Sequence, residues 1–289
     1  MNNLFIEHLT VIDFSYFQPD RGVVGESWIV DIELIGALNH EGMIFDFCHV
    51  KKVLKEALDE GLDHTLAVPA KLQGLSISED IDHKRIHIEY REPHGETQFK
   101  YESPRDAVFV IDEESIAVEN VQLLLEKQLN QLVPANVQQV ILTLRTEEIQ
   151  SAYYQYSHGL KKHKGDCQRI CHGHRSRIEI FRNKERDYES EEKWAATFAD
   201  VYLITEEDLL ASEITHLTHV GYDAEQGRFD VWLSPKQCYT MKTDSTVELI
   251  AAHIVEKVSE QDPDSHWEVK AYEGFQKGAK AYSKEARHE

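Results

Sequence analysis

The sequence predicts an α+β fold built from two similar units in tandem, and three observations carry this prediction. Strand-like runs occur in neighbouring pairs, an amphipathic helix follows a strand pair, and the order of elements begins again near residue 150. A shared order of elements indicates a duplicated unit, although the two halves show no obvious residue identity. We therefore expect one unit over residues 1–148 and a second over residues 149–289.

The first unit opens on two strand-like runs, residues 9–17 and 28–34, which are separated by a loop with proline and glycine. Such runs of β-branched and aromatic residues predict an antiparallel pair. Residues 50–58 then carry apolar side chains at the i, i+3, i+4, i+7 spacing of an amphipathic helix. Asp46 is placed to cap the start of this helix and Gly61 to end it.

The remainder of the first unit contains a further hairpin, a helix and a strand. The hairpin is predicted over residues 85–101, inside a polar region of residues 71–114. The helix is predicted over residues 118–132 and the strand over residues 137–144.

The second unit repeats this order. Strands are predicted over residues 153–160, 175–181 and 230–233, a helix over residues 247–258, and a closing strand over residues 267–272. In both units the helix is followed by a short loop containing proline and then by a strand. This parallel arrangement is the basis for the predicted duplication.

Composition restricts the classes of function. The chain has 289 residues with 29% charged and 41% hydrophobic side chains, a balance typical of a soluble globular protein. The net charge of −21 argues against a nucleic-acid or anionic-membrane partner, since either would repel this surface. The first residues lack the pattern of a secretory leader and no run of 18 apolar residues occurs, so we expect a cytoplasmic protein.

The chain has four cysteines: Cys48, Cys167, Cys171 and Cys238. Four cysteines in a chain of this length do not make a disulfide framework, and we expect free thiols. Cys48 and Cys238 are expected to be core residues, as free cysteine commonly is.

Three histidines form a candidate metal site. His172 and His174 stand at i and i+2 where a strand is predicted to begin, so their side chains point to the same face. His158 ends the preceding strand. Three imidazoles on neighbouring strands would hold zinc and leave one coordination position open, which is the catalytic arrangement. The chain contains 16 histidines, however, so a chance cluster is the competing interpretation.

Several motifs resemble the family of 6-pyruvoyl-tetrahydropterin and 6-carboxytetrahydropterin synthases. The first unit has Gly-Met-Ile-x-Asp-Phe and Leu-Asp-His, and the second has aromatic-x-x-x-His, Cys-x4-His-Gly-His, Ser-Thr-x-Glu and a late strand ending in glutamate. The resemblance covers most of both halves except residues 71–114 and 183–225. It implies the tunnelling fold (T-fold), with units of four antiparallel strands and helices on one face that assemble into barrels.

The resemblance also implies roles for individual residues. Zinc would be held by His158, His172 and His174, and the base would be Cys167. An Asp-His pair supports proton transfer in the family, and the matching residues here are Asp63 and His64. In the pterin pocket, the positions that match are Glu273, Thr246 and Glu248.

Each half departs from the family pattern in a different way. In the first half the metal positions fall at about Gln18, Val24 and Glu26, so that copy should bind no zinc. The second half has no clear Leu-Asp-His. The family's geometry then implies one composite site per chain, with metal and thiol from the second unit and the Asp-His pair from the first.

Some assignments stay open at this point. Cys171 competes with Cys167 as the base, but its position directly before His172 would turn it to the opposite strand face. The Asp63–His64 pair could instead be a contact at a helix terminus. Glu273 could be an exposed strand end.

The resemblance and the chemistry together predict a zinc-dependent carbon–oxygen lyase. Zinc can polarise a substrate hydroxyl or ketone while a nearby thiolate takes a neighbouring C–H proton. The expected reaction converts 7,8-dihydroneopterin triphosphate to 6-carboxy-5,6,7,8-tetrahydropterin, which feeds deazapurine (queuosine) biosynthesis, and a 6-pyruvoyl product is the alternative. A non-catalytic pterin- or purine-binding protein and a zinc hydrolase on another fold are the competing classes. We expect a homo-oligomer, a trimer of fused chains or a multiple of it.

Overall fold

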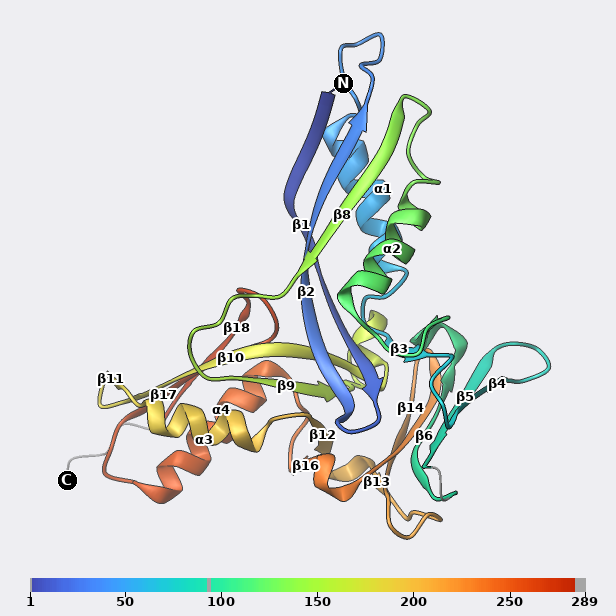
Figure 1. The fold of residues 1–289 in the computed structure, drawn as a ribbon. Helices are drawn as coiled ribbons and strands as arrows, with labels where there is room; N and C mark the ends of the chain where they lie inside the picture. The colour runs from blue at the N-terminus through green and yellow to red at the C-terminus, as the bar shows by residue number, and fades with distance from the viewer. Residues whose placement is uncertain (1, 93–94, 284–289) are drawn as a thin grey trace.

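The computed structural model describes residues 2–92 and 95–283, and within them the chain forms three β-sheets and four α-helices (Figure 1). The first half contains, in order, β1 (Asn2–Gln18), β2 (Gly22–Gly36), α1 (Phe47–Asp59), β3 (Leu66–Pro69), β4 (Leu75–Glu79), β5 (Arg85–Arg91), β6 (Thr97–Pro104), β7 (Val108–Ile111), α2 (Val118–Leu129) and β8 (Val137–Arg145). The second half contains β9 (Tyr153–His158), β10 (His172–Arg182), β11 (Glu185–Arg186), α3 (Tyr188–Thr197), β12 (Val201–Thr205), β13 (Leu209–Leu210), β14 (Thr218–Ala224), β15 (Gly227–Leu233), β16 (Cys238–Met241), α4 (Val247–Gln261), β17 (Trp267–Tyr272) and β18 (Gly278–Tyr282). Short 3₁₀ turns precede β7, β10, β13 and β16.

Each half has its own main sheet. The first is ordered β7-β3-β1-β2-β8, and the second is ordered β16-β12-β9-β10-β17-β18, with β11 paired to β10. Long antiparallel hairpins form the centre of both sheets, as predicted. The sheets are larger than four strands and are mixed, because β3 and β7 in the first half, and β12 and β16 in the second, join in parallel.

Local sequence explains where the predicted helices begin. Asp46 caps α1 by accepting a hydrogen bond from the backbone N–H of His49 at 3.0 Å. Thr246 caps α4 in the same way, accepting from the N–H of Leu249. The sequence did not indicate α3, a short helix that is rich in glutamate and buries mainly Trp194 and Ala195 against the sheet.

A third sheet joins the two halves. Its order is β13-β14-β15-β6-β5-β4, so three strands come from each half and meet at the antiparallel pair β6–β15, where Tyr101 lies opposite Val231. This accessory sheet accounts for the polar region 71–114, which supplies one of its two halves. The order of elements therefore repeats from β9 onward, with the accessory strands included, and the second half adds β11 and β18.

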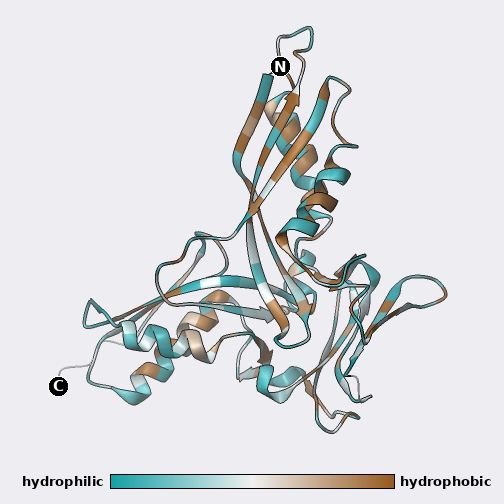
Figure 2. Ribbon diagram, in the orientation of Figure 1, coloured by the Kyte–Doolittle hydropathy of each residue, from teal (hydrophilic) through white to brown (hydrophobic). Residues whose placement is uncertain are grey.

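Three hydrophobic cores correspond to the three sheets. One lies between the first main sheet and α1 and α2, one between the second main sheet and α3 and α4, and the third on the buried face of the accessory sheet. Figure 2 shows hydrophobic residues along β1 and β2 and in the helices that pack on them. No helix among the described residues is long and apolar enough to cross a membrane.

The two central hairpins cross each other, and this crossing brings the halves together (Figure 1). Ser15 and Ser157 meet there, with their hydroxyl oxygens 2.7 Å apart. Gly25 and Gly173 allow the close approach, since a Cβ on Gly173 would lie 2.6 Å from the Cα of Gly25. The metal and thiol residues predicted from the sequence lie beside this crossing.

Candidate active site

The three predicted metal ligands lie together in the interior. His158 ends β9, and His172 and His174 lie on β10 at the same face. All three are at most 1% exposed, and one nitrogen from each ring lies within 4.8 Å of the other two. The spacing on two paired strands therefore produces the cluster that it predicted.

Each imidazole has its Nδ1 atom held by a different neighbour. His158 Nδ1 lies 3.0 Å from the backbone oxygen of Ser245, and His172 Nδ1 lies 3.1 Å from that of Arg169. His174 Nδ1 lies 3.2 Å from a carboxylate oxygen of Asp13. The two carbonyl contacts place a proton on Nδ1 of His158 and of His172 and leave their Nε2 lone pairs for another partner, and the nearby Asp13 carboxylate favours the same tautomer of His174.

The donor set fits a metal ion. The Nε2 atoms of His158 and His174 are 3.3 Å apart, and with Nδ1 protonated in both rings neither Nε2 can donate to the other. Burial, followed by the neighbouring imidazoles, holds the pKa of His158 and of His172 well below the usual value. Both rings are therefore neutral, which is the form that binds zinc.

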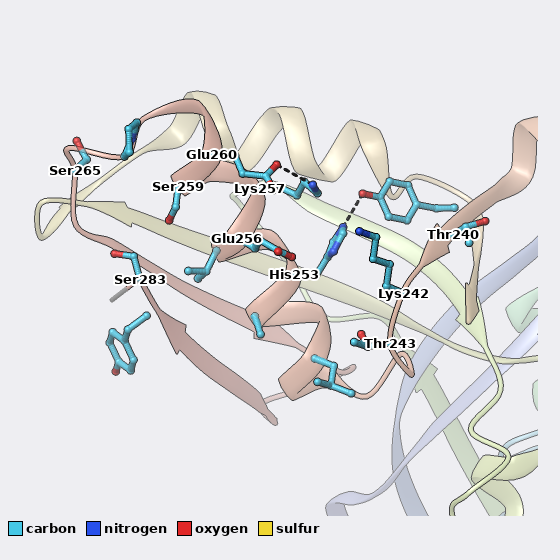
Figure 3. Close-up of a pocket in the computed structure, with 16 residues that line it drawn as sticks. Thr240, Lys242, Thr243, His253, Glu256, Lys257, Ser259, Glu260, Ser265 and Ser283 are labelled. Carbon is cyan, nitrogen blue, oxygen red and sulfur yellow. Dashed lines mark hydrogen bonds and ion pairs between the residues drawn. The ribbon is translucent and has the colours of Figure 1, made fainter. Parts of the chain in front are cut away.

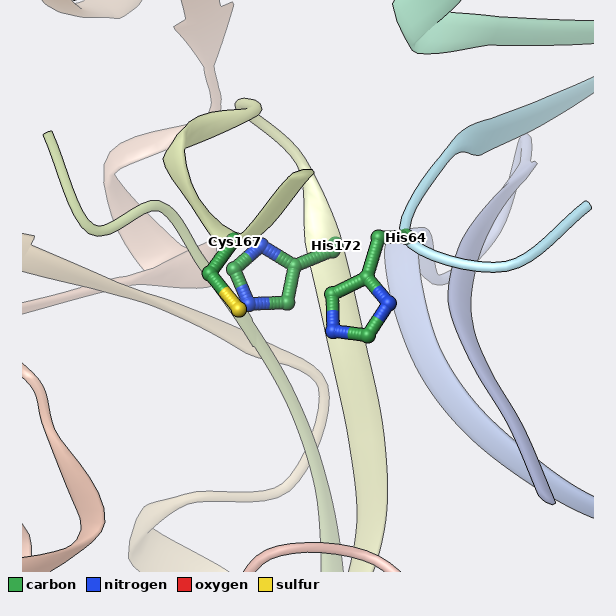
Figure 4. Close-up of side chains that lie close together, drawn as sticks. All are labelled: His64, Cys167 and His172. Carbon is green, nitrogen blue, oxygen red and sulfur yellow. The ribbon is translucent and has the colours of Figure 1, made fainter. Parts of the chain in front are cut away.

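The thiol of Cys167 lies at the edge of this cluster. Cys167 is in a short 3₁₀ turn, Gly165–Gln168, within the loop that connects β9 to β10. Its sulfur and one ring nitrogen each of His64 and His172 lie within 4.8 Å of one another (Figure 4). His64 belongs to the first half, so both halves contribute to this group.

Asp63 and His64 contact each other, and the His64 ring lies beside the histidine cluster. His64 Nδ1 lies 2.7 Å from a carboxylate oxygen of Asp63, and the ring centroids of His64 and His172 are 5.0 Å apart. Asp63 is itself held by the backbone N–H of Asp13 at 2.8 Å. Burial alone would lower the pKa of His64, but hydrogen bonds to Asp63 and Cys167 outweigh burial and raise that pKa to about 10.

The residues predicted to contact substrate are less closely grouped. Glu273 follows β17. Burial, followed by the charge of Glu273, raises the pKa of Tyr156 well above its usual value. The Tyr156 ring packs against His158 and His174. Thr246 is next to Ser245, the neighbour of His158. Glu248 is on the first turn of α4 with its side chain exposed.

Sequence reasoning missed a group of polar residues behind His174. Asp13 is 2% exposed and accepts hydrogen bonds from the Ser27 hydroxyl at 2.5 Å and from the Lys277 ammonium at 2.9 Å. Its burial would raise the pKa, but His174 and Lys277 hold the pKa of this carboxyl below its usual value. No sequence pattern indicates a role for Asp13, because it lies within a strand of the first half and contacts a histidine of the second half.

The other cysteines differ from Cys167. Cys171 is fully buried in the core of the accessory sheet, and burial raises the pKa of its thiol well above the usual value. Cys238 is half-buried, and its pKa is raised to about 11 by burial. Cys48 is exposed on α1, so the expectation that it belongs to the core was wrong. Helix α1 buries Val50, Leu54 and Leu58 instead.

Comparison with known proteins identifies the family. The family model described as 6-pyruvoyl tetrahydropterin synthase matches the chain twice, over residues 10–146 and 148–284. The chain belongs to this family. The double match confirms the resemblance seen in the sequence, and with it the T-fold as a tandem duplication.

Individual relatives match only part of the chain. The putative 6-carboxy-5,6,7,8-tetrahydropterin synthase of Pyrococcus horikoshii is 29% identical over 111 residues, which are 37% of this chain and 58% of the relative, so the match spans little more than half of that protein. A solved 6-pyruvoyl tetrahydropterin synthase from Plasmodium vivax is 18% identical with a TM-score of 0.37, and one from Plasmodium falciparum is 14% identical with a TM-score of 0.38. Each covers 50% of this chain and 97% of the solved chain.

In this duplicated synthase-family chain, the strand registers define which residues of the two halves are equivalent. Ser15 pairs with Gly25 across the first hairpin, and Ser157 pairs with Gly173 across the second. A second marker agrees: the N–H of His64 donates to the backbone oxygen of Asp13, and that of Asp200 donates to Gln155, both at 2.8 Å. His64 and Asp200 also share a left-handed backbone, with φ of 53° and 56°.

This register corrects one predicted position. The residues equivalent to His158, His172 and His174 are Tyr16, Val24 and Glu26, so Tyr16 and not Gln18 replaces the first ligand. The first hairpin continues past the equivalent of His158 to a tight turn at residues 19–21, so the last residue of β1 is not equivalent to the last residue of β9. None of these three side chains is an imidazole or a thiol, the ligands that zinc prefers in such sites.

The equivalent site of the first half is filled by one ion-pair network, which we call the Arg21 network (Arg21, Tyr16, Gln155 and Asp200). Arg21 donates to both carboxylate oxygens of Asp200, at 2.6 and 2.7 Å, to Gln155 at 2.8 Å and to the Tyr16 hydroxyl at 3.2 Å. Asp200 occupies the place of His64. The guanidinium therefore joins residues whose equivalents at the other site are the predicted metal ligand His158, Asp13 and His64.

A separate cavity shares no residue with the histidine cluster, with Cys167 or with the Arg21 network. It has a volume of about 860 Å³ and is lined by α4 with the ends of β16 and β18 (Figure 3). Its lining contains two polar pairs, the hydrogen bond between Tyr239 and His253 at 2.7 Å and the ion pair between Lys257 and Glu260. None of the predicted site residues lines this cavity.

Proposed function

We propose that this chain is a zinc-dependent lyase that converts 7,8-dihydroneopterin triphosphate to 6-carboxy-5,6,7,8-tetrahydropterin. The observation that carries the proposal is the meeting of Cys167 with His64 beside three buried histidines, all in one chain. A protein that only binds pterins would have no use for a thiol and a histidine pair next to a metal-binding cluster.

In the proposed site His158, His172 and His174 hold the zinc ion. Bound zinc would supply a Lewis acid that polarises a hydroxyl or ketone oxygen of the substrate side chain. The Nδ1 contacts of the three rings orient them before any metal binds, because each ring is fixed by a backbone oxygen or a carboxylate. Crossing of the two hairpins excludes bulk water from this side of the cluster.

Cys167 is the proposed base and Asp63–His64 the proposed relay. Cys167 is only partly exposed and lies within reach of a substrate carbon placed next to the histidine cluster. The raised pKa of His64 favours its protonated form, which would place a positive charge beside the sulfur and could return a proton. Asp63 fixes the ring of His64 through its 2.7 Å contact. Cys171 is disfavoured as the base because burial keeps it away from any substrate.

Glu273, Thr246 and Glu248 are proposed to bind the pterin ring. A carboxylate can accept two hydrogen bonds from an aminopyrimidine edge, which suits Glu273 at the end of β17 near the cluster. Thr246 lies at the start of α4 beside the contact of His158. Glu248 is the least supported of the three, because its side chain is exposed.

The 6-carboxy product is preferred over the 6-pyruvoyl product on the name of the Pyrococcus horikoshii relative. The family model carries the name of the other product, so 6-pyruvoyl-tetrahydropterin synthase is the second candidate. Both reactions start from the same substrate, and both need a metal ion and a base. Product identity therefore has to come from the reaction itself.

The organisation of the protein is part of the proposal. We propose units over residues 1–148 and 149–289, supported by the repeat of elements that begins at β9. We also propose assembly into a trimer of chains or a multiple of it. The main sheets support assembly, because β8 and β18 each have one neighbour among the described strands and present a free edge. Light scattering of the purified protein measures the mass of the assembly.

Mass spectrometry of the products tests the function. Zinc-loaded protein is incubated with 7,8-dihydroneopterin triphosphate, and the 6-carboxy pterin is the expected product. A 6-pyruvoyl pterin would select the second candidate. Unchanged substrate, with zinc confirmed in the protein, would contradict both and favour the binding-protein class.

A further inference from the structure

The proposed base lies on a long loop that has little regular structure of its own. Residues 159–171 connect β9 to β10, whereas three residues connect the equivalent strands β1 and β2. Within the longer loop only the turn Gly165–Gln168 is regular, and Cys167 belongs to it. A base must be held close to the atom from which it takes a proton, so this loop needs support from elsewhere.

The support comes from the β14–β15 hairpin of the accessory sheet. The Tyr222 hydroxyl donates to the backbone oxygen of Gln168 at 2.8 Å. Gln226, in the turn of the same hairpin, donates its backbone N–H to the side-chain oxygen of Gln168 at 2.8 Å. These two bonds hold the residue that directly follows Cys167.

Gln226 also holds the residue that precedes the thiol. Its side-chain N–H₂ group donates to Asp166 at 2.7 Å, and its side-chain oxygen accepts from Arg169 at 3.0 Å. Arg169 in turn pairs with Asp166 at 2.9 Å. The loop is therefore bonded to one hairpin on both sides of Cys167.

In the equivalent β5–β6 hairpin of the first half, the described residues 85–92 and 95–104 make no such hydrogen bonds to the β1–β2 connection, and individual residues account for the difference. Tyr222 lies opposite Phe229 in β15, and its equivalent Tyr90 lies opposite Phe99 in β6. Tyr90 and Phe99 pack on Phe17, with ring centroids 5.2 and 4.6 Å away. In the second half the position of Phe17 is taken by Gly159, where a Cβ would lie 2.0 Å from the Tyr222 hydroxyl.

The bracing hairpin is itself firmly placed. β15 pairs with β14 on one side and with β6 of the other half on the other, and Tyr222 packs in the buried core of the accessory sheet. A hydroxyl that is attached to a buried ring in a sheet has few alternative positions, so it fixes the loop more closely than a surface side chain could.

We propose that Tyr222 and Gln226 are positioning residues for Cys167, and that the accessory sheet serves the active site by holding the thiol-bearing loop. The effect on turnover rests on the proposed function. The bracing of the loop does not rest on the proposed function, and separate measurements test the bracing and the effect on turnover.

Three variants of the full chain test the proposal: Tyr222→Phe, Gln226→Ala and the double variant. Each keeps the metal ligands and Cys167, so zinc content and KM should stay as in the wild type. Since a misplacement of about 1 Å can cost on the order of 100-fold in rate, we expect kcat to fall by about 10-fold in each single variant and by up to about 100-fold in the double variant. Hydrogen exchange of residues 165–171 should lose protection, and iodoacetamide should alkylate Cys167 faster.

The chain offers a matched control for each change. Tyr90→Phe makes the same substitution at the equivalent position of the first half, where the ring packs on Phe17. Glu225→Ala changes the exposed residue beside Gln226 in the same turn. Neither control should alter kcat, exchange of the loop or alkylation of Cys167. Melting temperatures of all variants show whether any of them has lost its fold.

The readouts separate failure of this inference from failure of the proposed function. Unchanged exchange and alkylation in the double variant would overturn the bracing, whether or not the wild type has synthase activity. Increased exchange with an unchanged kcat would show that the thiol needs no such support and would also overturn the proposal. If the wild type forms no pterin product, the exchange and alkylation data alone decide the bracing.

Discussion

Two equivalent sites lie on either side of the hairpin crossing. Their backbone arrangement is the same, but the side chains at equivalent positions are of different kinds. On one side three buried histidines, Cys167 and His64 form a donor set for a metal ion and a base. On the other side the Arg21 network fills the corresponding place. The left-handed position that carries His64 on one side carries Asp200 on the other.

The comparison shows how a duplicated chain can concentrate its function in one site. In the proposed function, each half contributes residues to one site and carries other residue types at the equivalent positions of the second site. Arg21 supplies a positive charge at the site that carries no metal ligands. The carboxylate of Asp200 therefore has an ion-pair partner at the hairpin crossing. The network therefore holds the two halves together at the site that carries no zinc-type ligands.

The largest expected effect is on zinc content. Purified wild-type protein should contain one zinc ion per chain, and His174→Ala should contain none, with product formation lost by at least about 100-fold because the Lewis acid is gone. Glu26→Ala, at the equivalent position, should keep one zinc ion. Metal analysis of the three proteins checks this. Two zinc ions per wild-type chain would contradict the distinction between the sites.

The next effect concerns the left-handed position. His64→Asn should lower kcat by about 100-fold or more, because a group that carries protons is removed while asparagine tolerates the same backbone conformation. Asp200→Asn, the matched change, should leave kcat unaltered and lower the melting temperature by removing the charge that Arg21 contacts. Steady-state kinetics and thermal unfolding measure both. Equal loss of kcat in the two variants would show that the Arg21 network also serves the reaction.

A smaller effect is expected behind His174. Asp13→Asn should weaken zinc binding by about 10- to 100-fold, because the carboxylate that orients the His174 ring becomes a neutral amide. Gln155→Ala removes the equivalent side chain of the other site and should leave zinc affinity unchanged. Competition with a chromogenic chelator measures the affinity. An Asp13→Asn protein with wild-type affinity would show that the ring is held in place by packing alone.

Much of the fold could be predicted because its strongest patterns are local. Helix α1 follows the helical spacing and begins at its predicted cap, and the long hairpins follow their β-branched and aromatic runs. The pairing of β6 with β15 could not be predicted, since it joins residues some 130 positions apart and no local pattern encodes a partner. Helix α3 was missed because it is short and mostly polar.

In the candidate site, too, residues set by local patterns could be predicted and residues set by long-range contacts could not. The histidine cluster could be predicted because it depends on two paired strands and their period of two. Asp13, Tyr222 and Gln226 could not, because each acts through a contact made only when distant strands meet. The position of Tyr16 was missed because strand length in the first half differs from that in the second. Contacts that depend on register and tertiary approach leave no spacing signal.

The smallest expected effect on the enzyme comes from Glu26 and concerns stability alone. Burial raises the pKa of this carboxyl from its usual value near 4.5 to about 7, despite a hydrogen bond from the N–H of Ser27 and the charges of Arg175 and Arg21. Between these two values the native state binds more protons than the unfolded state, so this group makes the free energy of unfolding fall as pH rises through that window. Glu26→Gln should remove this fall in the free energy of unfolding. Between pH 4.5 and pH 8 the variant should become more stable than the wild type by about 1–3 kcal/mol. Urea unfolding across that range measures the difference, and Glu33→Gln, an exposed position on the same strand, is the matched control. Parallel pH profiles for wild type and Glu26→Gln would show that the carboxylate is already stabilised in its charged form, and that the second site retains an anion balanced by Arg21 and Arg175.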